Sequence, residues 1–497
     1  MSAFGPRPWF ATIERVETAT QTLHRLTSYE PGREWTDPID DPRVRTDFEP
    51  NDFGRLPYFC KQYPPGLSTL ALPRDLPTMS APALAVLSGA AQVPPGTLDL
   101  AGLARLLYLS AGVVRTSARP TYTHLFRAAG SAGGRFPLEL YVAVPEGSPD
   151  LPAGVHWYDP VAHSLVQVGP APRAGGAVTV IVTGVPWRTG WRYRERGYRH
   201  VYWDAGTMLS QLLPLADSAG LAPRLYTRFP DAAVAALAGA DQVHEWPVAL
   251  VALGEAGAAP VTEGSGPAAT GQTDAAPLEF SLVTAAQRAG DADGLGPGWA
   301  SGDASVLPAG VSAETPVDTV ITARGSQRRM NPDLGLPLET LRTCMSVAMR
   351  GISVAHWVAV HDVTGLAPGL YRWPDLSSAI HPGNLRDELY RVALEQSLAR
   401  DAAFVVIAAT SVAGLPDREY REAQLAAGLV EGRLHLAAYA LGASATGMTF
   451  LDSEIPALLG EPLDGLIFTC VGVPANTSRP AGPPGSPTAV RMVRPRE

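Results

Sequence analysis

Two arginines and a serine alternate in the segment 321–330, ITARGSQRRM. Because alternate side chains of an extended chain point to the same side, Arg324, Ser326 and Arg328 can face one ligand together. Two guanidinium groups and a hydroxyl donate hydrogen bonds in a geometry that suits a phosphate. The segment therefore predicts a phosphate site, and the alternative is a solvated basic turn beside a helix.

A run of small residues precedes a predicted strand in the segment 127–142, RAAGSAGGRFPLELYV. Ser131, Ala132 and Gly133 belong to this run, and residues this small let a planar ligand approach the backbone closely. The alternative is an ordinary loop ahead of a strand.

Four arginines and three tyrosines gather at 191–203, WRYRERGYRHVYW, where a long helix begins. Tyr193 could act as an acid or base there, and Arg192 could anchor a ligand. The alternative is a charged turn with buried aromatic side chains.

A small-residue loop follows a helical pattern at 437–448, AAYALGASATGM. Backbone N–H groups of Gly442 and Ala443 could donate hydrogen bonds to the edge of a ring. The alternative is a helix that simply ends at a glycine.

Several classes of protein are excluded by what the sequence lacks. It has no H-E-x-x-H, P-loop, G-x-S-x-G or G-x-G-x-x-G motif, and its ten histidines show no metal-ligand spacing, so no metal site is expected. The net charge of −9 disfavours a broad nucleic-acid-binding surface. No apolar run reaches 18 residues, so we expect no membrane span. The three separated cysteines and the absence of a signal-peptide pattern favour the cytoplasm.

The elements that must position these residues occur in two similar sets. Residues 71–255 and 316–480 each predict helix, strand, hairpin, strand, long helix and strand, in that order. Residues 1–70 predict an irregular lead-in, and the Gly- and Ala-rich residues 256–315 a flexible linker. Residues 481–497 predict an extended, Pro-rich tail.

Taken together, the four motifs resemble the FMN-dependent nitroreductase-like superfamily, and more closely its branch of SagB-type azoline dehydrogenases. The segments 127–142 and 191–206 are similar to two signatures of that branch, and 321–330 to the superfamily's phosphate motif. The resemblance implies an α+β fold of two halves fused as a pseudo-dimer, each a mostly antiparallel sheet packed with helices.

Each half lacks one motif of the family's site that the other half retains. No arginine stands near 78–90, where the first half would carry its phosphate motif, and 348–356 is a poor match to the small-residue loop. The resemblance therefore implies one composite FMN site per chain. The second half would hold the phosphate through Arg324, Ser326, Arg328 and Arg479, and the first would supply Ser131, Ala132, Gly133 and the Tyr193 segment.

The resemblance also implies a reaction. The chain would oxidise thiazolines or oxazolines to azoles in a ribosomally made precursor peptide, together with a cyclodehydratase complex. The branch's Lys-Tyr pair is Arg192-Tyr193 here, and neighbouring arginines would lower the pKa of Tyr193 so that it serves as acid or base; Tyr198 and Asp204 are the next candidates. Two alternatives stay open: an NAD(P)H-dependent nitroreductase or quinone reductase, and a flavin-less scaffold in a peptide-modifying complex.

Overall fold

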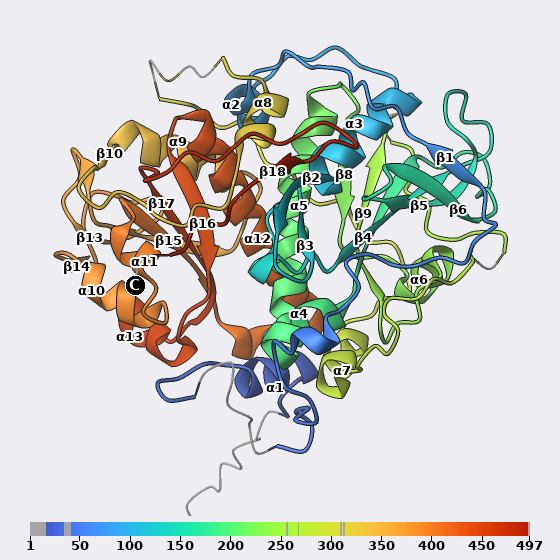
Figure 1. Ribbon diagram of the computed structural model, residues 1–497. Helices are drawn as coiled ribbons and strands as arrows, with labels where there is room; N and C mark the ends of the chain where they lie inside the picture. Colours follow the sequence, from blue (N-terminus) through green and yellow to red (C-terminus); the bar gives the residue numbers. More distant parts are fainter. Residues whose placement is uncertain are drawn as a thin grey trace, which may run out of the picture.

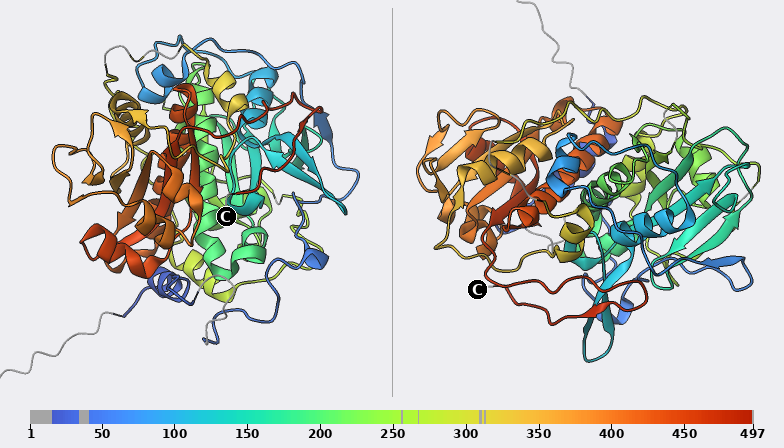
Figure 2. Two further views of the ribbon diagram at one scale, coloured as in Figure 1. Left: turned by 60° about the vertical axis from the view of Figure 1, so that its left-hand side comes forward. Right: turned by 90° about the horizontal axis from the view of Figure 1, so that it is seen from above.

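Two antiparallel sheets flank a central pair of long helices in the computed structural model (Figure 1). It describes residues 16–33, 41–254, 257–266, 268–308, 311 and 314–495. Seen from above, each sheet lies on the outer side of its own helices (Figure 2). The two halves thus pack helix to helix, as the sequence predicts for a pseudo-dimer.

The first half is built on a seven-stranded sheet. Its strands are, in spatial order, β1 (Thr69–Ala71), β6 (Ser164–Gly169), β5 (Gly154–Asp159), β4 (Leu138–Val144), β7 (Val178–Gly184), β9 (Trp246–Leu253) and β8 (Arg224–Tyr226). Its helices are α2 (Ala83–Ser88), α3 (Leu100–Ala111), α4 (Pro186–Tyr193), α5 (Gly197–Asp217) and α6 (Asp231–Ala238).

The second half repeats the plan with six strands. They are β14 (His381–Pro382), β13 (Gly369–Arg372), β11 (Ala355–Val360), β15 (Phe404–Thr410), β17 (Asp464–Gly472) and β16 (Ser444–Met448), again in spatial order. Its helices are α8 (Val317–Ala323), α9 (Leu338–Ala348), α10 (Arg386–Val392), α11 (Ser397–Asp401), α12 (Asp417–Ala440) and α13 (Ile455–Leu459). A small parallel pair, β10 (Leu336–Pro337) and β12 (Val363–Thr364), lies beside it.

Glycines let the two central helices touch backbone to backbone. A Cβ on Gly206 of α5 would collide with the backbone of Leu429, and one on Gly428 of α12 with the backbone of Trp203. The first turns of α2 and α8 also pair with each other, through a bridge between Pro82 and Pro316. Equivalent elements therefore meet across the seam, which is the arrangement of a dimer within one chain.

Two predicted helices have different ends in the structure. The apolar spacing of residues 98–115 predicts one helix, but the helix ends at Ala111, and the next residues form β2 (Val113–Ala118), which pairs with β3 (Thr123–Arg127). The sequence of residues 388–402 also predicts one helix, but it is divided into α10 and α11, because Leu394 and Glu395 adopt positive φ between them. None of the described helices is both long and apolar enough to cross a membrane.

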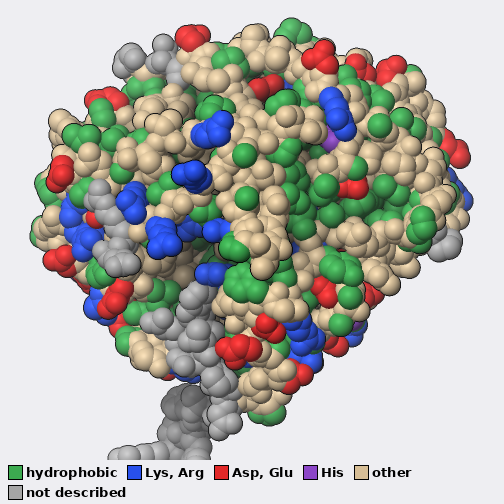
Figure 3. Space-filling model, viewed as in Figure 1, with side chains coloured by type: hydrophobic (Ala, Val, Ile, Leu, Met, Phe, Trp, Pro, Cys, Tyr) green, Lys and Arg blue, Asp and Glu red, His purple; other side chains and the backbone are tan. Residues whose placement is uncertain are grey.

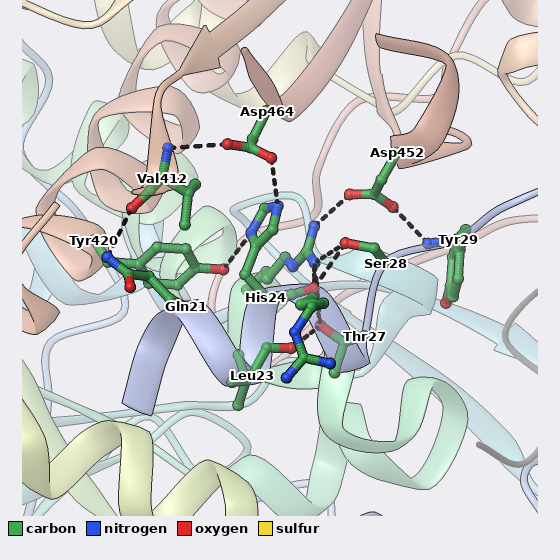
Figure 4. Close-up of polar contacts among 12 residues, drawn as sticks. Gln21, Leu23, His24, Thr27, Ser28, Tyr29, Val412, Tyr420, Asp452 and Asp464 are labelled. Atoms are coloured by element: carbon green, nitrogen blue, oxygen red, sulfur yellow. Dashed lines mark hydrogen bonds and ion pairs between the residues drawn. The ribbon is translucent and has the colours of Figure 1, made fainter. Parts of the chain in front are cut away.

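The lead-in carries a helix, α1 (Ala19–Leu26), that contacts both halves (Figure 4). Thr20 donates from its backbone to Asp417 in the second half. Just after α1, the backbone N–H of Tyr29 donates to Asp452, which also pairs with Arg196 and Arg199 of the first half, each at 2.6 Å. All three ionic side chains are buried, so this network ties the halves together at the N-terminal segment.

We expect Asp452→Asn to lower the free energy of unfolding by about 3–5 kcal/mol at pH 7, because it leaves two buried arginines without their carboxylate. Burial alone would raise the pKa of Asp452, but Arg196 and Arg199 outweigh it and lower the pKa to about 2, from an ordinary 3.8. The stabilisation is therefore complete above about pH 4 and is lost as the pH falls through about 2. Urea unfolding at a series of pH values should show the difference from wild type closing in that range.

A matched control lies two residues away. Glu454→Gln breaks a partly exposed ion pair with Arg391 and should change the free energy of unfolding by less than about 1 kcal/mol. An Asp452→Asn protein as stable as wild type at pH 7 would contradict the bridging role of this network.

The segments predicted as linker and tail both contact the halves. The sequence predicts a flexible linker at 256–315, but part of it forms α7 (Ser281–Ala289), and Phe280 and Val283 are buried there. The tail adds a strand, β18 (Thr488–Ala489), parallel to β2, and runs alongside the β2–β3 hairpin (Figure 2). In both segments, small residues let the backbone lie close against neighbouring elements.

Candidate functional site

A cavity of about 1330 Å³ lies where the two halves and the tail meet. The first half contributes residues 129–136 and the end of α4, the second contributes residues 324–328 and 446–449, and the tail contributes residues 489–493. Ligand pockets commonly measure roughly 300–1,000 Å³, so this cavity can hold a cofactor together with part of a substrate.

The predicted phosphate residues all line this cavity, but they do so differently. Arg324 is buried, and its guanidinium donates to the carbonyl of Ala128 in the first half and lies 3.4 Å from Nδ1 of His435. Ser326 and Arg328 are exposed. The structure thus uses Arg324 to join the halves and leaves Ser326 and Arg328 open to a ligand.

Arg479 also lines the cavity, close to the tail. Its Nη1 donates to the carbonyl of Ala489 at 2.7 Å, and its own carbonyl accepts from Nε of Arg115 at 2.8 Å. These bonds connect the second half, the tail and β2. The guanidinium of Arg479 is thereby held at the edge where the tail crosses the cavity.

The small-residue loop contains a 3₁₀ turn, Ala132–Gly134, that lies directly against Tyr193. Gly133 has φ of 59°, and a Cβ there would come within 2.7 Å of both Arg192 Cδ and Tyr193 Oη. Only glycine combines this backbone conformation with so close an approach. The loop and Tyr193 therefore form one continuous wall of the cavity.

Asp204 of α5 anchors this loop through two hydrogen bonds. It accepts from Oγ of Ser131 at 2.5 Å and from the backbone N–H of Ala132 at 2.9 Å, and Ser131 in turn accepts from the N–H of Phe136. Burial raises the pKa of Asp204 to about 7, although both hydrogen bonds oppose the rise. A carboxyl group that titrates near neutral pH thus borders the cavity.

Asp204→Asn should preserve the loop, because an amide can accept from Ala132 and donate to Ser131 in the same places. It should also remove a pH dependence. The folded pKa of about 7 lies above the ordinary 3.8, so ionising Asp204 costs stability increasingly as the pH rises from about 4 to 7. At about 1.4 kcal/mol for each pH unit, the variant should gain up to about 4 kcal/mol over wild type across that range in urea unfolding. A constant difference between the two proteins would contradict the raised pKa.

Tyr193 ends helix α4, and the guanidinium of Arg192 lies 5.5 Å from its ring centre. The ring of His200 contacts it edge-on, at 4.1 Å between centroids. Burial raises the pKa of Tyr193, and Arg192 only partly opposes this. The expectation that neighbouring arginines lower this pKa is therefore wrong.

The reason lies in where those arginines point. Arg196 pairs with Asp452, and Arg194 donates to the backbone carbonyl of Arg45. The guanidinium groups of Arg194 and Arg196 are therefore directed away from the phenol of Tyr193 and do little to lower its pKa. Of the other candidates for proton transfer, Tyr198 is buried beside Gln287, outside the cavity lining, whereas Asp204 is part of it.

Gly442 and Ala443 lie outside the lining of the cavity. The N–H of Ala443 donates to the carbonyl of Ala438 and so closes the end of α12, while Gly442 adopts φ of 76°. This is the glycine-terminated helix that the sequence left as the alternative. The residues that reach the cavity from this side are 446–449, at the end of β16.

Glu431 also lines the cavity, and none of the four sequence motifs contains it. It accepts from Oγ1 of Thr207 at 2.5 Å and pairs with Nε2 of His435 at 3.0 Å. Burial would raise the pKa of Glu431, but His435 and Thr207 outweigh it and lower the pKa. The i, i+4 spacing of Glu431 and His435 on a helix is the signal that could have revealed this pair.

The equivalent position on the other side of the seam is filled with protein. Gly89, at the end of α2, lies so close to the guanidinium of Arg350 that a Cβ there would collide with it. Nε1 of Trp299 donates to the carbonyl of Gly351, and the N–H of Ser305 donates to the carbonyl of Ser88. The segment 299–305 therefore packs where a second, symmetric site would lie.

Among the described residues, no group of three or more His, Cys, Asp or Glu side chains could hold a metal ion. No protein-family model matches the chain, and a search of curated proteins finds no similar sequence.

Solved structures do match it. A nitroreductase-like protein from Anabaena variabilis is 23% identical, with a TM-score of 0.70, and the match covers 92% of this chain and 100% of that one. One from Ralstonia eutropha is 22% identical over 43% of this chain and 100% of its own, with a TM-score of 0.32. The Escherichia coli microcin synthetase complex McbBCD, solved with truncated pro-MccB17 bound, is 18% identical over 44% of this chain and 77% of that one, with a TM-score of 0.28. The near full-length match shows that this chain has the nitroreductase-like α+β fold, with both halves in one polypeptide.

Proposed function

We propose that the chain is an FMN-dependent dehydrogenase that oxidises azolines to azoles in a ribosomally made peptide. The observation that carries the proposal is the composite cavity. Its predicted phosphate residues, Arg324, Ser326, Arg328 and Arg479, come from the second half, and its glycine-containing loop and Tyr193 come from the first. Neither half supplies both parts.

The residues around the cavity fit FMN. Ser326 and Arg328 are exposed there and would hold the phosphate with Arg479. The loop around Gly133 lines the cavity and would lie against the flavin ring, because its small residues let a planar ligand approach the backbone closely. Arg324 would act indirectly, by holding the two halves in register through Ala128. When bound, FMN supplies the hydride acceptor for a two-electron oxidation.

The chain's own residues would handle the proton. Oxidation of an azoline breaks two bonds to hydrogen and forms one ring double bond, so a proton leaves together with the hydride. Tyr193 stays a neutral phenol because its pKa is raised, and it would donate a hydrogen bond to the substrate and stabilise the charge that develops as the proton leaves. Asp204, with its pKa of about 7, is the group best matched to accept a proton at neutral pH.

The proposal also implies partners and a place of action. An azoline arises by cyclodehydration of a Cys, Ser or Thr side chain onto the backbone, so a cyclodehydratase must act first. We propose that the chain works with such a complex on the precursor peptide, in the cytoplasm, and that oxygen reoxidises the flavin.

The experiment that tests the proposal combines a flavin count with mass spectrometry. The purified chain should bind about one FMN, because the second position is filled by the segment 299–305. With an azoline-containing peptide it should remove 2 Da for each ring oxidised. Two flavins per chain would contradict the composite site. A protein that binds no FMN would be a scaffold, and rapid bleaching by NADPH with reduction of a nitro compound, but no azoline oxidation, would make it a nitroreductase.

A further inference from the structure

The cavity collects positive charge in a chain that is acidic as a whole. Nine arginines line it, against two carboxylates, while the chain carries a net charge of −9. On the face of the molecule seen in Figure 3, Lys and Arg side chains likewise gather on the second half, close to the seam. The charge is thus concentrated where the two halves meet.

Few of these arginines pair directly with a carboxylate among the described residues. Setting aside Arg192, which contacts Asn51, none of the other eight arginines forms an ion pair with a carboxylate among the described residues. The buried Arg115, Arg127 and Arg324 donate to backbone carbonyls instead. The two carboxylates, Asp204 and Glu431, are already bound by Ser131 and by His435.

One phosphate cannot account for so many arginines. A phosphate monoester carries at most two negative charges, and Ser326, Arg328 and Arg479 are enough to hold it. The buried Arg115, Arg127 and Arg324 are held by backbone carbonyls, so the arginines that remain at the cavity are available to a second anion.

Two of the arginines, Arg119 and Arg135, line the first-half side of the cavity together with several aromatic side chains. Phe53 lies 5.5 Å from Trp191, and the guanidinium of Arg135 lies 4.6 Å over the ring of Trp191. Arg119 is exposed at the turn between β2 and β3.

His124 lies near both arginines. Burial, Arg135 and Arg119 lower its pKa to about 4, so His124 is neutral and adds no charge of its own. The wall therefore presents two guanidinium groups and several aromatic faces to the cavity.

We propose that Arg119 and Arg135, with the rings of Phe53, Tyr122 and Trp191, form a substrate subsite for an acidic peptide segment beside the azoline ring. This inference rests on the proposed function. Guanidinium groups bind carboxylates through paired hydrogen bonds, and aromatic faces pack against a planar heterocycle. The subsite would hold the peptide so that its ring faces the loop around Gly133.

The test uses the FMN-loaded full chain and two dye-labelled hexapeptides that contain a thiazole, the oxidised product. They differ only in the residues beside the ring, Asp-Asp in one and Asn-Asn in the other. Fluorescence anisotropy should show the Asp peptide binding at least about 10-fold tighter, as expected for charged hydrogen bonds. Raising the salt concentration should reduce that preference.

Substitutions test which residues cause the preference for the Asp peptide. Arg119→Gln combined with Arg135→Gln should abolish most of the preference for the Asp peptide, whereas Arg135→Lys should keep part of it. Arg173→Ala removes one positive charge at an exposed position outside the cavity and should change nothing. Circular dichroism checks that each variant is folded.

The outcomes separate this inference from the proposed function. Equal binding of the two peptides, or an unchanged preference in the folded double variant, would overturn the subsite even if azolines are oxidised. Selective binding of the Asp peptide without any azoline oxidation would support the subsite and refute the proposed reaction.

Discussion

Tyr193→Phe should leave FMN bound and slow azoline oxidation by roughly 100-fold or more, the usual loss when a hydrogen-bond donor to developing charge is removed. The phenyl ring keeps the packing against His200, so the cavity wall should stay intact. Only the hydroxyl is lost, and with it the hydrogen bond that Tyr193 would donate to the substrate. The measurement is loss of 2 Da per azoline over time, with a flavin spectrum of each protein.

Neighbouring substitutions sharpen this prediction. Arg192→Lys should be tolerated, because it restores the residue of the Lys-Tyr pair that this segment resembles. Arg192→Ala should be slower, because it removes the charge next to the phenol. Tyr390→Phe, outside the cavity on α10, is the matched control and should oxidise at the wild-type rate.

Turnover near the wild-type rate by Tyr193→Phe would rule out the assignment of Tyr193. Asp204, whose pKa is about 7, would then accept the proton without a hydrogen bond from this phenol to the substrate. Because Asp204→Asn keeps the hydrogen bonds of the loop, its rate would distinguish a role in proton transfer from a role in anchoring the loop.

Arg328→Ala should weaken FMN binding by roughly 10- to 150-fold, since a charge-assisted hydrogen bond contributes about 1.5–3 kcal/mol. Arg328 faces the cavity and has few protein groups to hold, so the loss should appear in affinity and leave stability unchanged. Titrating the flavin-free protein with FMN and following flavin fluorescence measures this directly. Arg329→Ala is the control, because Arg329 lies outside the cavity lining and donates to the carbonyl of Arg494.

Arg324→Ala should also lose FMN, but for a different reason. Its guanidinium is committed to the first-half carbonyl of Ala128, so removing it should lower the unfolding midpoint as well. Full FMN affinity in the double variant Arg324→Ala and Arg328→Ala would refute the phosphate assignment.

The sequence alone was enough to predict the two-fold plan of the fold. Apolar periodicity is local and strong in long elements, so α5, α12 and the main strands could be predicted within a few residues. The same holds for part of the site. Arg324, Ser326, Arg328 and the loop at Gly133 carry recognisable local patterns, and the structure brings all of them to one cavity.

Other features depend on residues that are distant in the sequence, and only the tertiary structure decided them. The division of labour between Arg324 and Arg328 follows from the position of Ala128 in the other half. The direction of the pKa shift of Tyr193 follows from burial and from the pairing of Arg196 with Asp452, 256 residues away. A local pattern contains neither fact, because charge and solvent access at one residue are set by what folds against it.

The segments with the weakest sequence patterns differ most between the prediction and the structure. Residues 299–305 and 489–493 are poor in regular patterns, yet one fills the second symmetric position and the other forms a wall of the cavity. The position of a segment rich in small residues and prolines cannot be predicted from its own sequence. Such a segment packs through its shape and through backbone hydrogen bonds to partners far along the chain. The sequence thus determined the motifs of each half and predicted one composite site, and the tertiary structure decided which side chains line the cavity and what surrounds them.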